Sequence, residues 1–128
     1  MSVIKVPLKH GYKVGESVFK NAFIRPYTAA DLMDAEEESE RLVATQNKDG
    51  EVEHKLVLSP ALYGRNIFRR QIISIDDVSG PFTIEELTEN LHLEDFVLLQ
   101  QKTEELDNAM VAKQLKAAVE EKTEAGKP

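Results

Sequence analysis

The chain of 128 residues contains no cysteine and no tryptophan. The absence of cysteine excludes disulfide bridges, thiolate metal sites and cysteine nucleophiles, and it is typical of proteins in a reducing compartment. No apolar run approaches the roughly 20 residues that a membrane-spanning helix needs. Residues 1–9 also lack the apolar segment of a signal peptide. The sequence therefore predicts one small domain that acts inside the cell, without a membrane partner.

Recognisable catalytic and cofactor-binding motifs are also missing. The sequence contains no glycine-rich phosphate loop, and no serine lies in a nucleophile-elbow context. His10, His54 and His92 are far apart, and none has a second ligand at metal-binding spacing on the same helix face. We therefore expect no enzymatic activity, no catalytic residues, no cofactor and no metal site.

Charge is abundant but unevenly distributed around a net charge of -7. The local charge is +4 over residues 1–26, -7 over 31–53, +4 over 55–70 and -9 over 76–107. The negative total disfavours binding to nucleic acid. Blocks of alternating sign favour self-association, because a basic block of one copy can meet an acidic block of another. The same blocks are also typical of ordinary solvated helix faces, so both interpretations stay open.

Periodicity and turn residues predict an α+β fold, with a short N-terminal antiparallel β-hairpin followed by three to four α-helices. The hairpin strands are expected over residues 3–8 and 16–25. Thr28 is expected to cap a helix over residues 29–43, Ser59 one that extends to residue 73, and Thr83 a short one, with the last long helix from about residue 92. Residues 45–54 are predicted to form a mobile loop, or at most a small hairpin leading into residues 55–58.

The domain is expected to cover residues 1–110. A helical extension over residues 111–128 should then fade into a disordered, charged tail from Glu120 onward. Gly64 lies inside the second predicted helix, where glycine costs about 1 kcal/mol relative to alanine. This cost suggests that a neighbouring element packs closely against Gly64.

Apolar positions on the first and last long helices are the candidates for burial against the core or against a partner. Only those that are exposed in the monomer can contact a partner, and the sequence does not separate the two uses. These candidate partner-binding residues are Leu32, Met33, Leu42, Phe96, Leu99 and Leu106.

Three segments, taken in order, carry a resemblance to a known family. Arg25-Pro26 is followed by TAADLMDAE at residues 28–36, then by an apolar helix at residues 63–75, and then by LHLEDFVLL at residues 91–99. In this order and spacing the segments resemble the tail assembly chaperones of Mu-like and related long-tailed phages, over roughly residues 16–107.

The resemblance implies a non-catalytic chaperone that binds the phage tape measure protein and keeps it soluble during tail morphogenesis. It implies work in the host cell cytoplasm, absence from the mature virion, and a homo-oligomer. Members of this family often have a frameshifted longer form, and Gly126-Lys127 is compatible with a slippery codon pair there or with a casual hydrophilic terminus. The alternative is a structural tail or head–tail joining protein retained in the virion.

Overall fold

The computed structural model describes residues 2–125, with side chains through residue 120. Its centre is a four-stranded antiparallel sheet in the order β1–β2–β5–β6. β1 (Ile4–Val14) and β2 (Ser17–Ile24) form the N-terminal hairpin, and β5 (Ile72–Ile75) and β6 (Val78–Ser79) extend the sheet. The predicted hairpin and the α+β class are confirmed, although β1 is longer than expected because it continues through an irregularity in its pairing.

Helices follow each pair of strands along the chain. The described residues contain four helices, α1 (Ala29–Glu38), α2 (Pro60–Gln71), α3 (Ile84–Asn90) and α4 (Leu93–Ala125). The three predicted N-caps are confirmed, since the side chains of Thr28, Ser59 and Thr83 each accept a backbone N–H of the first helical turn.

The first helix is shorter than predicted. α1 ends at Glu38, where the fully buried Ser39 caps it and donates its hydroxyl to the carbonyl of Ala35. The chain is extended beyond this point, so Leu42 lies in β3 (Glu40–Gln46) and not in a helix. The prediction of a helix to residue 43 was wrong because its weak apolar stripe is outweighed by the Ser39 cap and by strand pairing.

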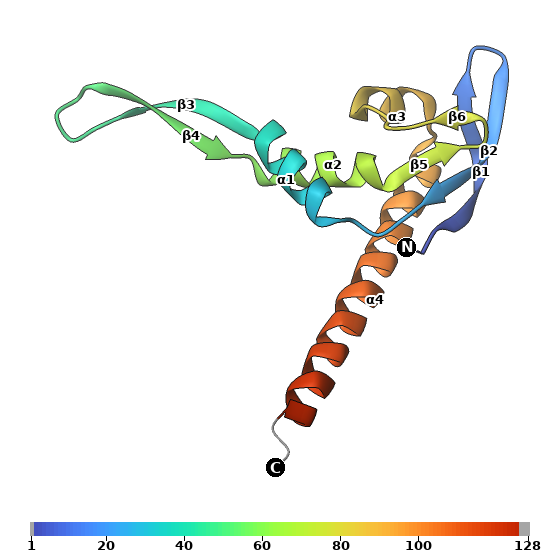
Figure 1. Cartoon of the computed structure of the whole chain (residues 1–128). Coiled ribbons are helices and arrows are strands. Elements are labelled where there is room, and N and C mark those ends of the chain that lie inside the picture. Colours follow the sequence, from blue (N-terminus) through green and yellow to red (C-terminus); the bar gives the residue numbers. More distant parts are fainter. Residues whose placement is uncertain (1, 126–128) are drawn as a thin grey trace.

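Residues 40–58 form a second, separate hairpin. β3 pairs with β4 (Val52–Leu58) in unbroken register, from Glu40 opposite Leu58 to Gln46 opposite Val52. Of the two alternatives for this region the structure has the hairpin, and it is longer than the small one expected. Figure 1 shows it as an arm that extends away from the rest of the molecule.

The core lies between the four-stranded sheet, α2, α3 and the first half of α4. The predicted second helix ends early, because Ile72 adopts an extended conformation and begins β5. α2 buries only Asn66, Phe68 and Gln71 and leaves much of its first two turns exposed, so it is not the all-round apolar centre that its composition suggested. The buried core cluster consists of Val6, Leu8, Tyr12, Ala22, Ile24, Phe68, Ile72, Ile75, Phe82, Leu87, Leu91 and Leu99.

The last helix leaves the body of the molecule. α4 begins beside the sheet, and its second half projects free of the other elements (Figure 1). The helix continues through Ala125, past Glu120, where we had expected order to end, and Gly126-Lys127 lies outside the described residues. None of the helices in residues 2–125 has the length and apolar content required to cross a membrane.

Candidate partner-binding site

An ion pair at the end of β2 joins the sheet to two helices. The Arg25 guanidinium donates to both carboxylate oxygens of Asp31, from Nη1 to Oδ2 at 2.6 Å and from Nη2 to Oδ1 at 3.1 Å. Nη2 also donates to the carbonyl of Arg70 in α2, at 3.1 Å. Asp31 accepts the N–H of Thr28 at 2.8 Å, which completes the capping box of α1. This bidentate arrangement, which we call the Arg25 clasp, fixes the start of α1.

A second carboxylate holds α4 against the same segment. Oδ1 of Asp107 accepts the backbone N–H of Tyr27 at 3.1 Å and the side-chain amide of Gln71 at 2.9 Å. Gln71 also donates to the carbonyl of Arg25, at 3.1 Å. The chain between β2 and α1 is therefore held from both sides, by α2 and by α4.

These two carboxylates have pKa values shifted in opposite directions. Burial alone would raise the pKa of Asp31, but the hydrogen bonds from Arg25 and Thr28 outweigh it and hold that pKa below its ordinary value. Burial raises the pKa of Asp107, and the nearby negative charges of Asp31 and Glu104 raise it further, against the hydrogen bonds that the carboxylate accepts. Asp31 is therefore stabilised as an anion, and Asp107 is not.

A third carboxylate anchors the start of α4 to β1. The fully buried Asp95 accepts the backbone N–H groups of Lys9, His10 and Gly11 at 2.7, 2.8 and 2.9 Å. Burial would raise the pKa of Asp95, but these three donors outweigh it and lower that pKa. The interaction satisfies the strand amides where the pairing of β1 is irregular.

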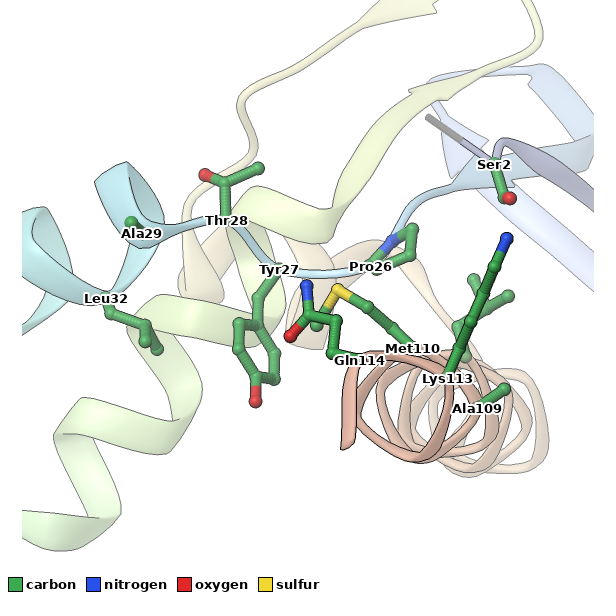
Figure 2. A pocket seen from close by; sticks show the side chains of 11 residues that line it. Ser2, Pro26, Tyr27, Thr28, Ala29, Leu32, Ala109, Met110, Lys113 and Gln114 are labelled. Carbon is green, nitrogen blue, oxygen red and sulfur yellow. The ribbon is translucent and has the colours of Figure 1, made fainter. Parts of the chain in front are cut away.

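A groove opens between α4 and the segment that leads from β2 into α1. It has a volume of about 690 Å³. Figure 2 shows Tyr27 and Leu32 on one side, with Met110 and Gln114 projecting from α4 on the other. The lining is apolar along most of its length and carries polar groups at its margins; it consists of Ser2, Pro26, Tyr27, Thr28, Ala29, Leu32, Leu106, Ala109, Met110, Lys113 and Gln114.

The structure brings two of the six candidate partner-binding residues together. Leu32 and Leu106 are half-buried and face this groove from α1 and α4. The ring of Phe96 is half-buried and packs edge-on against Phe68, 5.4 Å between centroids, and Leu99 is fully buried in the core.

The other two candidates are exposed but lie elsewhere. Met33 is 70% exposed on α1, next to Leu32 but outside the groove lining. Leu42 is 65% exposed on the β3–β4 arm. Partner contact by any of the six residues stays a prediction.

Sequence reasoning missed most of the groove. Tyr27 was overlooked because it stands between a proline and an N-cap, without periodic context. Met110 lies on the last predicted helix, but its exposure depends on where that helix leaves the body, which the sequence does not indicate. A second groove lies between α2 and α4 and shares Tyr27 with the first.

The fold also brings together two histidines that the sequence separates. The rings of His10 and His92 stack with centroids 3.7 Å apart, and ligand atoms of these two side chains and of Glu94 lie within 4.8 Å of one another. Nδ1 of His92 accepts the N–H of Glu94 at 3.1 Å, and Glu94 pairs with Lys9 at 3.1 Å. Nε2 of His10 also lies 3.5 Å from Oε1 of Glu94, so this cluster joins β1 to the start of α4.

Comparison with known proteins places the chain in a family. The family described as "Tail assembly protein gp41" matches residues 8–123, which is most of the chain. The chain belongs to this gp41 family. No solved structure matches it.

Curated relatives of this gp41-family chain come from a phage and a prophage. It is 39% identical over 84 residues to the Mu-like prophage FluMu protein gp41 of Haemophilus influenzae, a match that covers 66% of the chain and 63% of the relative. It is 38% identical over 89 residues to the probable tail assembly protein gp41 of Escherichia phage Mu, which covers 70% of the chain and 58% of the relative. The probable tail assembly protein FS-gp41 of the same phage matches at 38% identity over 89 residues, 70% of the chain and 44% of the relative. In each case the match spans less than two thirds of the relative.

The motifs that carried the family resemblance have structural roles in this gp41-family chain. Arg25, Thr28 and Asp31 form the Arg25 clasp, and Asp95 and Leu99 of the last motif hold α4 on the sheet. The first motif also supplies part of the groove lining, through Pro26, Thr28, Ala29 and Leu32, whereas Leu106 and Met110 lie beyond the last motif.

Proposed function

We propose that this gp41-family chain acts in phage tail assembly as a non-catalytic chaperone that binds the tape measure protein. It would keep this partner soluble in the host cell cytoplasm while the tail forms, and it would be absent from the mature virion. The names of the phage Mu relatives, both probable tail assembly proteins, support a role in tail assembly. The tape measure protein as partner comes from the family resemblance of the sequence.

The observation that carries the proposal is the apolar groove between α1 and α4. The Arg25 clasp fixes the start of α1, and Asp107 ties the Tyr27 segment to α4, so both walls of the groove are held in place without a partner. An amphipathic helix is the partner that such a groove suits, since a helix can lay one apolar stripe into it. The long, helical tape measure protein offers many such stripes.

The polar residues at the edge of the groove suit a partner that must later leave. Lys113, Gln114 and Thr28 border the apolar floor and leave it open to water. Contacts at such a margin contribute little affinity each, so binding by one copy is expected to be weak and reversible. Many copies along a long partner would then hold it in solution until tube subunits displace them.

Co-expression with the tape measure protein of the same phage tests the proposal. The intact chain should raise the soluble fraction of the tape measure protein and co-purify with it. Ala109 lies exposed in the groove wall, so Ala109→Arg should block the groove, lose co-purification and leave folding intact. Ala112→Arg places the same side chain at an exposed position on α4 outside the groove lining and should behave as the wild type. Insoluble tape measure protein beside the wild-type chain would refute the proposal.

A longer form made by frameshifting remains part of the proposal. The same 89-residue match covers 58% of one phage Mu relative and 44% of the other, so FS-gp41 is the longer of the two. The nucleotide sequence across codons 126 and 127 tests the idea for this chain, because a slippery pair followed by an overlapping reading frame is required.

The second candidate function is a structural tail or head–tail joining protein that stays in the virion. The open edges of the β3–β4 arm favour it, because sheet pairing between subunits builds many polymeric tubes. Mass spectrometry of purified virions separates the two functions, since a chaperone should be absent and a joining protein present in fixed copy number.

A further inference from the structure

The β3–β4 arm exposes both apolar side chains and unpaired strand edges. All residues of both strands are exposed, and no third strand of the described chain pairs with either of them. Because side chains alternate along a strand, one face of the arm collects the apolar residues Leu42, Ala44, Val52, Leu56 and Leu58. Two-stranded hairpins of this kind are marginally stable alone, which favours a partner for the arm.

The base of the arm is firmly attached to the body. Asn66 of α2 donates its side-chain amide to the buried hydroxyl of Ser39 at 3.0 Å, at the point where β3 begins. Glu38 pairs with Arg69 at 2.6 Å and with Arg70. The arm is therefore presented in a defined direction.

The turn of the arm reveals which backbone groups face outward. The N–H of Asn47 donates to the carbonyl of Glu51 at 2.9 Å, so this pair is a hydrogen-bonded one. Hydrogen-bonded and non-hydrogen-bonded pairs alternate in an antiparallel ladder, so Glu53 and Lys55 also bond inward to β3. The N–H and C=O groups of Val52, His54 and Leu56 consequently point away from β3, along the free edge of β4.

We propose that β4 pairs antiparallel with β4 of a second copy, about a two-fold axis at His54. In this register the outward-bonding Val52 of each copy lies opposite Leu56 of the other, and His54 lies opposite His54, so the new ladder can form with an apolar pair on each side of the axis. Glu53 lies opposite Lys55 of the second copy, and the symmetry creates this ion pair twice.

The charges select this register and this edge. The nearest allowed registers on either side place Glu53 opposite Glu53 or Lys55 opposite Lys55, which are repulsive. The edge of β3 cannot form a matching pair of ion pairs, because Arg41 is the only charged residue inside that strand. In a β3–β3 pairing Arg41 would face Val43, Thr45 or another Arg41, and no ion pair would form. Pairing through β4 would also merge the two apolar faces, including Leu42, into one four-stranded sheet.

Charge reversal tests the interface in the full-length chain. We expect a concentration-dependent dimer by analytical ultracentrifugation. Glu53→Lys or Lys55→Glu places like charges opposite each other twice, and each should weaken the dimer by about tenfold or more. The double variant with both reversals restores opposite charges and should dimerise like the wild type. Far-ultraviolet circular dichroism should report the same fold for all four proteins.

Mixing the two single variants gives a result that a folding defect cannot imitate. Glu53→Lys carries two lysines at the interface and Lys55→Glu carries two glutamates, so an equimolar mixture should form a heterodimer at a concentration where each variant alone is mostly monomeric. A monomeric wild type at all concentrations, or a dimer that ignores both charge reversals, would overturn the proposal. The result is independent of tape measure binding, because the groove lies on α1 and α4.

Discussion

Three aspartates hold the framework of this molecule together, and each accepts backbone or side-chain donors from a different element. Asp31 joins β2 to α1, Asp95 joins β1 to α4, and Asp107 joins α4 to the segment around Tyr27. The sequence predicts only the local part of this scheme, the cap of Asp31 on Thr28. The backbone groups that Asp95 and Asp107 accept lie at least 80 residues away, and Gln71 lies 36 residues from Asp107, so no local pattern indicates these partners.

Asp95→Asn should destabilise the fold by about 2 kcal/mol at neutral pH, because an amide group replaces one of the oxygens that accept three strand N–H groups. The lowered pKa of Asp95 gives this effect a defined pH dependence. A carboxylate with a lowered folded pKa contributes stability that is complete above its unfolded pKa and is lost as pH falls through the folded pKa. Chemical denaturation between pH 7 and pH 2 should therefore show the two proteins converging in acid.

The neighbouring Glu94→Gln is the matched control for this experiment. Its side chain is largely exposed and pairs with Lys9 on the surface, so Glu94→Gln should leave the free energy of unfolding close to that of the wild type. Equal destabilisation by both variants would contradict the role assigned to Asp95.

Asp107→Asn should have the opposite effect and stabilise the fold at neutral pH. Asparagine keeps a side-chain oxygen for Tyr27 and Gln71 but removes the negative charge that burial and Asp31 disfavour. An acid with a raised folded pKa costs stability above that pKa and none below its unfolded pKa. The free energy of unfolding of the variant should exceed that of the wild type at pH 7, and the difference should shrink as pH falls. A variant that is less stable than the wild type at pH 7 would show that the charge is favourable.

At the scale of elements, the sequence predicts the helix starts better than the helix ends. Thr28, Ser59 and Thr83 carry their capping chemistry within one turn, and all three caps are correct. The ends of α1 and α2 depend on what the following residues pair with, at Ser39 and Ile72, and both predictions ran too far. The β3–β4 arm was difficult to predict because its strands expose apolar residues that would normally indicate burial.

The surroundings of Gly64 in α2 differ from the prediction, and the difference has a measurable consequence. The prediction of close packing was wrong, since a Cβ built at Gly64 meets no atom within 4 Å. Gly64→Ala should therefore stabilise the protein by about 0.5–1 kcal/mol through helix propensity, measured as an increase in the free energy of unfolding.

Gly11→Ala provides the contrasting control for this change. Gly11 has φ of +91°, and its added Cβ would lie 2.6 Å from Cγ1 of Val18. Gly11→Ala should therefore lower the stability of the protein. If Gly64→Ala also lowered it, α2 would make a contact at Gly64 that the structure lacks.

At the scale of the whole molecule, a small anchored body carries two projections, the β3–β4 arm and the second half of α4 (Figure 1). The arm has an open edge suited to a second copy, while α4 forms one wall of the apolar groove. In the two proposals self-association uses the arm and partner binding uses the groove, so each should be lost without the other. Ala109→Arg and Lys55→Glu are the variants that should separate them.

The central claim is that an amphipathic helix of the tape measure protein occupies the groove between α1 and α4. Nuclear magnetic resonance of the isotope-labelled chain, titrated with synthetic helical segments of that partner, tests it most directly. The account predicts saturable shift changes centred on Tyr27, Leu32, Leu106 and Met110, and their loss in Ala109→Arg but not in Ala112→Arg. Shift changes confined to other surfaces, or none with any segment of the tape measure protein, would contradict it.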